Sequence, residues 1–392
     1  MLKKREEFSM KIRMYNVGFG DCFCLRDRNK RLLVDFGTSN ARISGLPRCQ
    51  VFDMVISDLT TIEHKNLLLT HFNLDHLSGL LYMVKKRSSS YDFQKIYLPD
   101  VFSEKWMSRI LVLLLLADMV KNSYLPSRQI SLLALVEALQ EKPQTVELLS
   151  RNSVFEGKYQ ALWPDMSIIK KEAVETSACL WDKYGSTMEK LEAFAEKIRK
   201  IVWKMTDIGR ESEEKNNTLQ TIGMLEKELR EIRGTVDFQE LVHYINEEKI
   251  SLRKFKNKIS IVFQNSRDGE QNLLFTGDVT KEHMQMSADN YDGKLPLYEE
   301  YWCIKVPHHG TQSHYFDFSP YMPENMLISN GMYHANSKQK AKENRISAQY
   351  GGLFYIRDAH MYCSECDNCD ACHDECSCKE RTVIGDQCYL DI

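Results

Sequence analysis

The sequence predicts an α/β fold in which helices cover a β-sheet and metal-binding side chains gather along one edge of that sheet. Short apolar runs, which are typical of buried strands, alternate with longer segments of helical periodicity. Three of the apolar runs end directly in histidine or aspartate. These observations together predict the fold class and the place of the functional site.

The first of these strand ends is the most informative stretch of the chain. The apolar run 67–69 ends shortly before three metal-capable residues, His71, Asp75 and His76. Their spacing places them on no single face of a helix or a strand, so we expect a loop that folds around a cation. Imidazole and carboxylate together suit Zn²⁺, Mn²⁺ or Fe²⁺. Taken alone, the segment could also be a strand end with polar capping residues.

Two later apolar runs end in residues of the same types. The run 272–276 precedes Asp278, and the run 301–306 precedes the paired residues His308 and His309. Three such strand ends in one chain predict a single metal centre, built from loops at one edge of the sheet.

Composition and charge limit the class of protein. The 392 residues are 43% hydrophobic and 27% charged, which is ordinary for a soluble globular protein with a sizeable core. The formal net charge is −3 at pH 7. An overall basic surface is therefore excluded, and any contact with nucleic acid needs a local patch.

The chain carries no predicted signal for export or membrane insertion. Its charged start is followed by no apolar segment, and the apolar run 110–117 is too short to span a bilayer, so we expect it in a buried helix. We expect residues 1–9 to be a disordered extension, no membrane partner and a cytoplasmic location. In that reducing compartment the twelve cysteines are predicted to be thiols or metal ligands rather than disulfides.

Short strands and helices are predicted on both sides of the first metal-binding segment. The strands are expected at 11–16, 22–26 and 31–35. The helices are expected over 78–86, 104–121 and 127–141. They form a helical layer over the sheet.

Helical periodicity dominates from 166 to 256. Apolar residues recur there every three or four positions, in two sets that the polar stretch 207–217 separates. This pattern predicts a long, coiled-coil-like helical hairpin. The hairpin could be a structural buttress or the arm of a homodimer. It could also be a substrate lid or an arm that binds a partner protein.

The C-terminal part contains an unusual run of cysteines. Six of them fall within sixteen residues, and an acidic background makes the run a poor phosphate-binding surface: Cys363, Cys366, Cys369, Cys372, Cys376 and Cys378. Their spacing predicts a structural Zn²⁺ site, and the alternatives are an iron–sulfur cluster or no bound metal. The segment 382–390 is predicted to close the domain as a β-hairpin.

The order of these motifs resembles the metallo-β-lactamase superfamily. Asp35 in the segment 33–37 comes first, then 71–76, then Asp278 and then the histidine pair. The nearer resemblance is to the hydrolase domain of the ComEC DNA-uptake proteins. Five further segments carry it, the first as an opening strand with its Gly-rich turn and the others as strands: 15–21, 161–164, 257–262, 328–331 and 354–358.

The resemblance implies an αββα sandwich. It assigns 10–165 and 257–392 to a hydrolase core, 166–256 to an inserted helical hairpin, and 363–378 to a Cys-rich loop within the C-terminal part. It also implies roles at the site. Asp75, Asp278 and His309 would be catalytic, and Asp35 would hold a ligand histidine from behind. The metal ligands would be His71, Asn73, Asp75, His76, Asp278 and His308, although the sequence leaves open which of the paired histidines binds.

Asn73 departs from the pattern of the family, whose metal loop usually reads His-x-His-x-Asp-His. The amide oxygen of Asn73 is neutral and binds Zn²⁺ less well than an imidazole does. Three interpretations follow. The site could hold one metal, it could use a harder ion such as Mn²⁺, or it could be degenerate and only bind a ligand.

The resemblance implies a metal-dependent phosphodiesterase that cleaves DNA or RNA with a metal-activated water. A free-standing nuclease in a bacterial defence or stress response is one setting. The same fold hosts other chemistry, so two alternatives stay open. One is a hydrolase of small esters, lactones or cyclic nucleotides. The other is a non-catalytic binding or sensing module.

Overall fold

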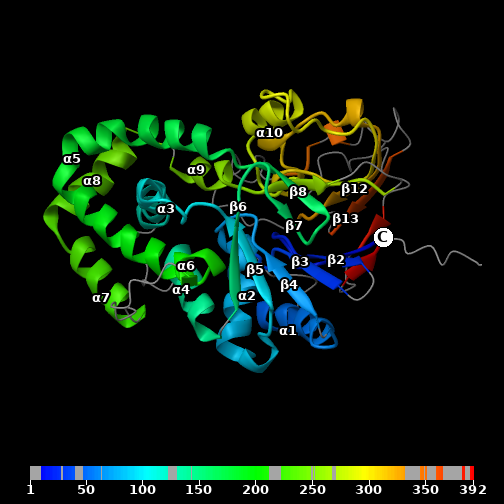
Figure 1. The fold of residues 1–392 in the computed structure, drawn as a ribbon, viewed down its shortest axis with the longest axis horizontal. Helices are drawn as coiled ribbons and strands as arrows, with labels where there is room; N and C mark the ends of the chain where they lie inside the picture. The colour runs from blue at the N-terminus through cyan, green and yellow to red at the C-terminus, as the bar shows by residue number, and fades with distance from the viewer. Residues whose placement is uncertain are drawn as a thin grey trace, which may run out of the picture.

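Two β-sheets pack face to face at the centre of the molecule, with helices on the outside (Figure 1). The computed structural model describes residues 10–27, 30–39, 47–62, 64–121, 130–142, 144–211, 222–248, 250, 252–266, 271–331, 345–347, 349–350, 359–364, 382–384 and 389–392. This mixed α/β architecture is consistent with the metallo-β-lactamase fold that the sequence implies.

The first sheet combines antiparallel and parallel strands. Its order is β15 (Tyr389–Asp391), β1 (Lys11–Tyr15), β2 (Phe23–Asp27), β3 (Lys30–Val34), β4 (Lys65–Leu68), β5 (Lys95–Pro99) and β6 (Thr145–Leu149). From β3 to β6 all neighbours are parallel, so the carboxyl ends of these strands lie at one edge.

The second sheet repeats this arrangement. Its order is β14 (Thr382–Val383), β13 (His360–Cys363), β12 (Pro323–Ile328), β11 (Tyr301–Lys305), β10 (Leu273–Phe275), β9 (Val262–Asn265), β8 (Tyr159–Trp163) and β7 (Val154–Phe155). The strands from β10 to β14 are parallel, and those from β7 to β10 are antiparallel.

The two sheets share one buried layer of side chains between them. It includes Phe23 and Val34 from the first sheet and Phe263, Phe275 and Leu327 from the second. The rings of Phe23 and Phe275 meet edge to face, with their centroids 5.5 Å apart. This layer fixes the distance between the sheets.

Helices cover the outer face of the first sheet. They are α1 (Arg48–Leu59), α2 (Leu74–Lys86), α3 (Ser108–Lys121) and α4 (Ser131–Glu141), with the short 3₁₀ turns η1 (Ser88–Ser90) and η2 (Lys105–Met107). The apolar run 110–117 is buried within α3, as the sequence predicts. On the second sheet, α10 (Lys281–Ala288) lies next to β8, and η4 (His308–Gly310), η5 (Gln312–His314) and η6 (Ser319–Tyr321) follow β11.

The described residues between 166 and 256 are mainly helical and pack against this helical layer (Figure 1). It contains α5 (Met166–Trp203), α6 (Asp207–Glu211), α7 (Ile222–Arg233), α8 (Val236–Glu247) and α9 (Arg253–Lys258). The returning arm is broken between α7 and α8, because the Oγ1 atom of Thr235 caps a new helix at Phe238. That the region is an inserted hairpin, a coiled coil or a dimer arm stays a prediction.

The long helix α5 is tied to α10 through a polar contact. Glu172 on α5 lies 2.9 Å from Nε2 of His283, on α10, with which it forms a hydrogen bond, and forms an ion pair with Nζ of Lys258 at 3.0 Å. The ring of His283 also packs on Trp163, with centroids 4.6 Å apart. These contacts connect the helical region with the loop that follows β10.

Two predictions about strands are wrong. The segment 382–390 forms no hairpin, because β14 pairs in parallel with β13 whereas β15 pairs with β1 in the other sheet. The segment 257–262 is not a strand throughout, since it begins in α9 and becomes extended only at Val262. The predicted extension 1–9 and the segment 354–358 lie outside the described residues. No helix within the described ranges has the length and apolar character needed to cross a membrane.

The helical region and the sandwich should unfold together, because one hydrophobic cluster joins them. Leu225, on α7, is 0% exposed, and Met224 beside it is 56% exposed. We expect Leu225→Ala to lower the free energy of unfolding of the whole chain by about 2–5 kcal/mol, because it leaves a cavity. Met224→Ala should change it by less than about 0.5 kcal/mol. Urea unfolding followed by circular dichroism measures both; a separate early transition in Leu225→Ala would contradict the shared core.

Candidate metal centre

The three predicted strand ends meet at the junction of the two sheets. Asp35 follows β3, His71 follows β4, Asp278 follows β10, and the paired histidines follow β11. Asp75 and His76 lie in the first turn of α2 rather than in a loop, so the expectation of a continuous metal loop is wrong in this detail. The helix begins directly after Asn73, and the turn brings both side chains toward Asp278.

Asp278 is the centre of this arrangement. Its Oδ2 atom lies 3.1 Å from Nε2 of His76, 3.6 Å from Nε2 of His308 and 3.8 Å from Nε2 of both His71 and His309. Two ligand atoms that each lie about 2.1 Å from one tetrahedral ion are about 3.4 Å apart. The spacing of these four imidazoles around the carboxylate therefore suits shared cations.

One set of ligand-capable atoms is compact. Asp75, His76, Asp278 and His309 offer atoms that all lie within 4.8 Å of one another. The Nε2 atoms of His71 and His308 lie 3.8 and 3.6 Å from Oδ2 of Asp278 but are not members of this set. The structure thus brings both paired histidines to the centre, and it groups His309, not His308, with Asp75 and His76.

Each of the four imidazole rings forms a hydrogen bond through its Nδ1 atom, on the side of the ring away from Asp278. The partners of these atoms are Thr70 Oγ1 at 3.1 Å for His71, Asp35 Oδ2 at 2.8 Å for His76, Thr311 Oγ1 at 2.9 Å for His308 and the Ser329 carbonyl at 2.9 Å for His309. This pattern turns Nε2 inward in all four rings and favours a lone pair on it. The prediction that Asp35 holds a histidine of the site is confirmed.

Several buried polar atoms in this centre have no hydrogen-bond partner within the described residues. They are Nε2 of His71, Nε2 of His309 and Oδ1 of Asp278. Leaving a buried polar group unsatisfied costs about 1–3 kcal/mol. A bound divalent cation would satisfy the inward-facing nitrogens, so the donor set fits a metal.

Negative charge accumulates in this buried region. Four carboxylates, those of Asp21, Asp35, Asp75 and Asp278, lie within it, and Lys305 is a buried ammonium that forms an ion pair with Asp21. Burial raises the pKa of Asp21, but Lys305 and His309 outweigh it and hold that pKa at about 2. The excess of negative charge attracts a cation.

The same charges act on the histidines when no cation is bound. Burial lowers the pKa of His309, but the carboxylates of Asp278 and Asp21 outweigh it and raise the pKa to about 9. The pKa of His76 is also raised, because Asp278 and Asp35 outweigh its burial. Protons on these rings therefore compete with a metal ion for the inward-facing nitrogens.

The backbone at the strand ends adopts the left-handed region. Asp35, His308 and His309 have φ values of 57°, 45° and 56°, which each cost free energy for a residue with a side chain. Gly277 has φ of 51°, and a Cβ atom there would lie 2.3 Å from Ser260 Oγ, which accepts from the Asp278 N–H at 2.8 Å. Glycine thus lets Ser260 orient Asp278.

Asn73 is turned toward α9. Its Nδ2 atom donates to Oδ1 of the buried residue Asn257 at 3.1 Å, and its side chain makes no capping hydrogen bond to α2. The predicted ligand position is thus occupied by an amide that is already paired. Its role as a ligand stays a prediction.

The other candidate residues fall into three groups. Cys363 is buried in β13, and the remaining cysteines of the predicted zinc site, Cys366, Cys369, Cys372, Cys376 and Cys378, lie outside the described residues, as does His334. His64 and His360 are exposed, as expected. His314 stacks on His308, with ring centroids 3.9 Å apart, and so lies at the centre.

Sequence reasoning gave too little weight to three residues that support the centre. Asp21 appeared only as part of a Gly-rich turn, Ser260 only as part of a segment resembling the family, and Lys305 only as a residue before the paired histidines. The one signal that could have found them was position, since Lys305 ends an apolar run and Ser260 directly precedes one. Their partners lie 18 to 288 residues away in the sequence.

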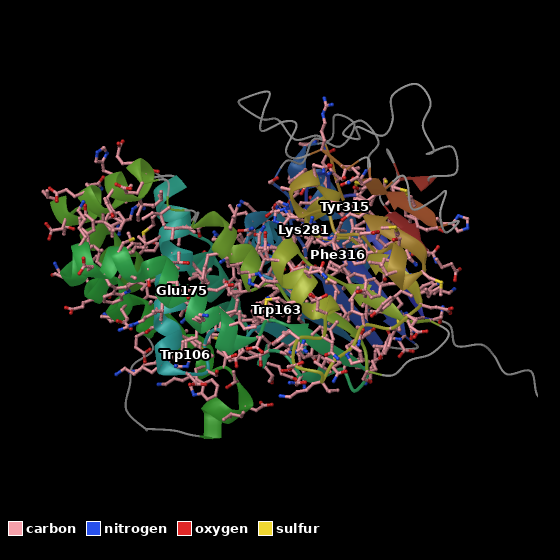
Figure 2. All side chains as sticks on the ribbon, turned by 90° about the horizontal axis from the view of Figure 1, so that it is seen from above. Trp106, Trp163, Glu175, Lys281, Tyr315 and Phe316 are labelled. Atoms are coloured by element: carbon pink, nitrogen blue, oxygen red, sulfur yellow. The ribbon has the colours of Figure 1, made fainter. Side chains whose placement is uncertain are left out.

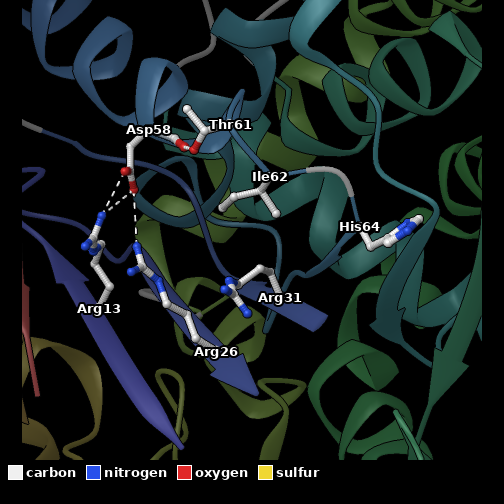
Figure 3. Close-up of a pocket in the computed structure, with 7 residues that line it drawn as sticks. All are labelled: Arg13, Arg26, Arg31, Asp58, Thr61, Ile62 and His64. Carbon is white, nitrogen blue, oxygen red and sulfur yellow. Dashed lines mark hydrogen bonds and ion pairs between the residues drawn. The ribbon is translucent and has the colours of Figure 1, made fainter. Parts of the chain in front are cut away.

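A second polar pocket lies at the opposite edge of the first sheet (Figure 3). It has a volume of about 470 Å³ and is lined by Arg13, Arg26, Arg31, Asp58, Thr61, Ile62 and His64. The guanidinium of Arg13 donates to both Asp58 and Asp391, which joins α1, β1 and β15. Because its charges are largely paired, we interpret this pocket as a structural ion-pair network.

Comparisons with known proteins show little sequence similarity. No family model matches the chain, and no curated protein matches it. A similar solved structure is the metallo-β-lactamase fold protein YhfI from Bacillus subtilis. It is 8% identical, the match covers 91% of this chain and 97% of that chain, and the TM-score is 0.38.

Metal binding should release a proton and become tighter as the pH rises. Since His309 has a pKa of about 9 without a cation, its ring is protonated at pH 7 and must lose that proton to bind a metal. We expect the affinity to rise about tenfold per pH unit between about pH 7 and 9 for each proton released. Titration calorimetry in two buffers of different ionisation enthalpy measures the proton. Equal heats in both buffers would contradict the expectation.

Asn73→His should add a ligand to those of His71 and His308. We expect the metal content per chain to rise by about one ion, because a third imidazole would complete a second set of ligands. Elemental analysis of purified protein measures this. Asn73→Ala is the matched control, since it also releases Asn257 but adds no imidazole, and its metal content should not rise. An unchanged content in Asn73→His would show that the second position does not form.

Proposed function

We propose that the chain is a metal-dependent hydrolase that cleaves phosphodiester bonds in DNA or RNA. The observation that carries the proposal is the set of four inward-facing imidazole nitrogens around Oδ2 of Asp278. When bound, a divalent cation such as Zn²⁺ or Mn²⁺ would lower the pKa of a water and stabilise negative charge on the substrate.

The residues of the centre have distinct roles in this proposal. Asp75, His76, Asp278 and His309 would hold one cation. His71 and His308, which also lie near Asp278, would hold a second cation more weakly, because the family's second histidine is replaced by Asn73. Lys305 keeps Asp21 ionised and lies 3.7 Å from Oδ1 of Asp278, which limits the rotation of that carboxylate.

His314 is the candidate group for contacting the leaving oxygen of the substrate. It packs on the outer face of His308, and its Nδ1 atom lies 2.9 Å from the hydroxyl of Ser313. Burial and the adjacent His308 ring lower the pKa of His314 to about 3. Its neutral ring would therefore stabilise a leaving oxygen by hydrogen bonding rather than by giving up a proton.

The resemblance of five further segments, such as 15–21 and 257–262, to the DNA-uptake hydrolases supports nucleic acid as the substrate. The donor set alone would serve other esters as well. A second candidate function is a non-catalytic binding module. The pairing of Asn73 with Asn257 favours it, because a half-formed second position would weaken turnover more than binding.

Asp278→Asn should abolish nuclease activity. Removing one charged ligand from the centre is expected to lower the rate by at least about 100-fold and to reduce the bound metal. Cleavage of labelled single- and double-stranded DNA and RNA in Mg²⁺, Mn²⁺ and Zn²⁺ measures the rate. Asp289→Asn, an exposed aspartate just after α10, is the matched control and should retain full activity.

Two results would contradict the proposed function. If wild-type protein leaves every nucleic acid intact with all three ions, the proposed nuclease function is wrong. Hydrolysis of lactones or small esters would then indicate the alternative substrate class. Equal activity of wild type and Asp278→Asn would show that the cleavage comes from a contaminant.

A further inference from the structure

A pocket between η2, the start of α3 and α5, to which α5 contributes residues on both sides of its kink at Tyr184, lies outside the metal centre. Its volume is about 390 Å³, and it is lined by Lys105, Trp106, Arg109, Ile110, Lys170, Ala173, Val174 and Glu192. Figure 2 shows Trp106 in the helical part of the molecule, near Glu175 of α5 and well apart from Lys281, Tyr315 and Phe316. None of the roles given above to the metal centre uses these residues.

The charge of this pocket is positive. Its three cationic side chains face one carboxylate, that of Glu192, which already pairs with Arg109 at 3.3 Å and accepts from the Ser108 hydroxyl at 3.2 Å. Within the described part of the chain, no carboxylate lies at ion-pair distance from Lys105 or Lys170. The lining thus keeps two ammonium groups free to bind phosphate, in a protein whose overall charge is negative.

An aromatic ring lies beside these charges. Trp106 is half-buried, packs against the hydrophobic core and donates its indole N–H to Glu104 at 2.7 Å, so part of the ring remains exposed. The Nζ atom of Lys170 lies 4.8 Å from the centroid of this ring. Ile110 and Ala173 supply buried apolar surface, and Val174 is 49% exposed. An aromatic face with adjacent cations is the combination that binds an unstacked nucleobase and its phosphate.

The pocket lies on the same side of the first sheet as the metal centre. It follows β5, which is parallel to β4, the strand that leads to His71. Phe102, in the loop after β5, packs against Phe72 with ring centroids 5.9 Å apart. Trp106 is four residues beyond Phe102, a reach of at most about 14 Å. One buried ring contact and a four-residue segment therefore connect the loop after β4, which carries His71, with Trp106.

We propose that this pocket binds one nucleotide of a single-stranded nucleic acid, at a distance from the bond that is cut. The base stacks on Trp106, and Lys105 and Lys170 contact the flanking phosphates. The inference rests on the proposed nuclease function and narrows its substrate to single strands, since bases within a duplex are not free to stack on a side chain.

The test compares a long substrate with a small one. The full-length protein is assayed on a single-stranded oligonucleotide, on the same sequence as a duplex and on bis(p-nitrophenyl) phosphate, which is too small to occupy both places. We expect Lys170→Glu and Trp106→Ala each to raise KM for the single strand about tenfold and to leave kcat and the small diester unchanged. Trp106→Phe should recover most of the loss.

Lys171→Glu is the matched control for charge. Lys171 is the next residue on α5, its side chain is 77% exposed, and it lies outside the pocket. Equal effects of Lys170→Glu and Lys171→Glu would overturn the proposal, because they would show a general effect of charge. An equal loss on the duplex would overturn it too.

Failure of the nuclease itself gives a different result. If wild-type protein cleaves neither the oligonucleotide nor the small diester, the proposed function fails. Fluorescence anisotropy of a labelled single strand then tests whether the pocket binds nucleic acid. Binding that Lys170→Glu weakens about tenfold and Lys171→Glu leaves unchanged would keep the pocket as a binding site. Absence of binding, or binding that both variants leave unchanged, would show that the pocket is not a binding site for nucleic acid.

Discussion

The buried carboxylate of Asp278 is the interaction on which the arrangement of the site depends. A charge without compensation in a protein interior costs several kcal/mol, so its surroundings must supply positive charge or hydrogen-bond donors. Here the ammonium of Lys305, 3.7 Å from Oδ1 of Asp278, supplies one positive charge, and Ser260 fixes the backbone by accepting from the Asp278 N–H. The four imidazoles complete this environment, and they come from both sheets of the sandwich.

This requirement explains the unusual backbone at the strand ends. In both sheets, parallel strands end at the junction, so their carboxyl ends lie close together. This arrangement alone does not set the directions of the side chains. Left-handed φ values at Asp35, His308 and His309 set the directions of these side chains, at a cost in conformational energy. That cost is tolerable because each of these residues is held by hydrogen bonds to a second element, as Asp35 is by Thr70 and His309 by Ser329.

The sequence was sufficient to predict the residues at the strand ends. It was insufficient to predict the contacts between the elements that carry them. His71, Asp278 and the paired histidines were predictable because each follows an apolar run, and the apolar periodicity also placed α3 and α5. The pairing of Asn73 with Asn257 was not predictable, because it depends on how α9 lies against α2. For the same reason, the sequence did not predict that β14 and β15 belong to different sheets. Two short strands near each other in sequence suggest a hairpin, whereas their partners are set by β13 and β1.

The polar contact between α5 and α10 has a mechanical consequence. His283 lies five residues after Asp278, and Glu172 clamps its ring while also binding Lys258 at the end of α9. A rigid-body movement of α5 must therefore break both contacts or carry α9 and α10 with it. Since α10 continues from the loop that positions Asp278, and α9 carries the partner of Asn73, a displacement of α5 would act as a lever on both sides of the centre. The part of α5 before its kink at Tyr184 is thus coupled to the loops of the candidate centre.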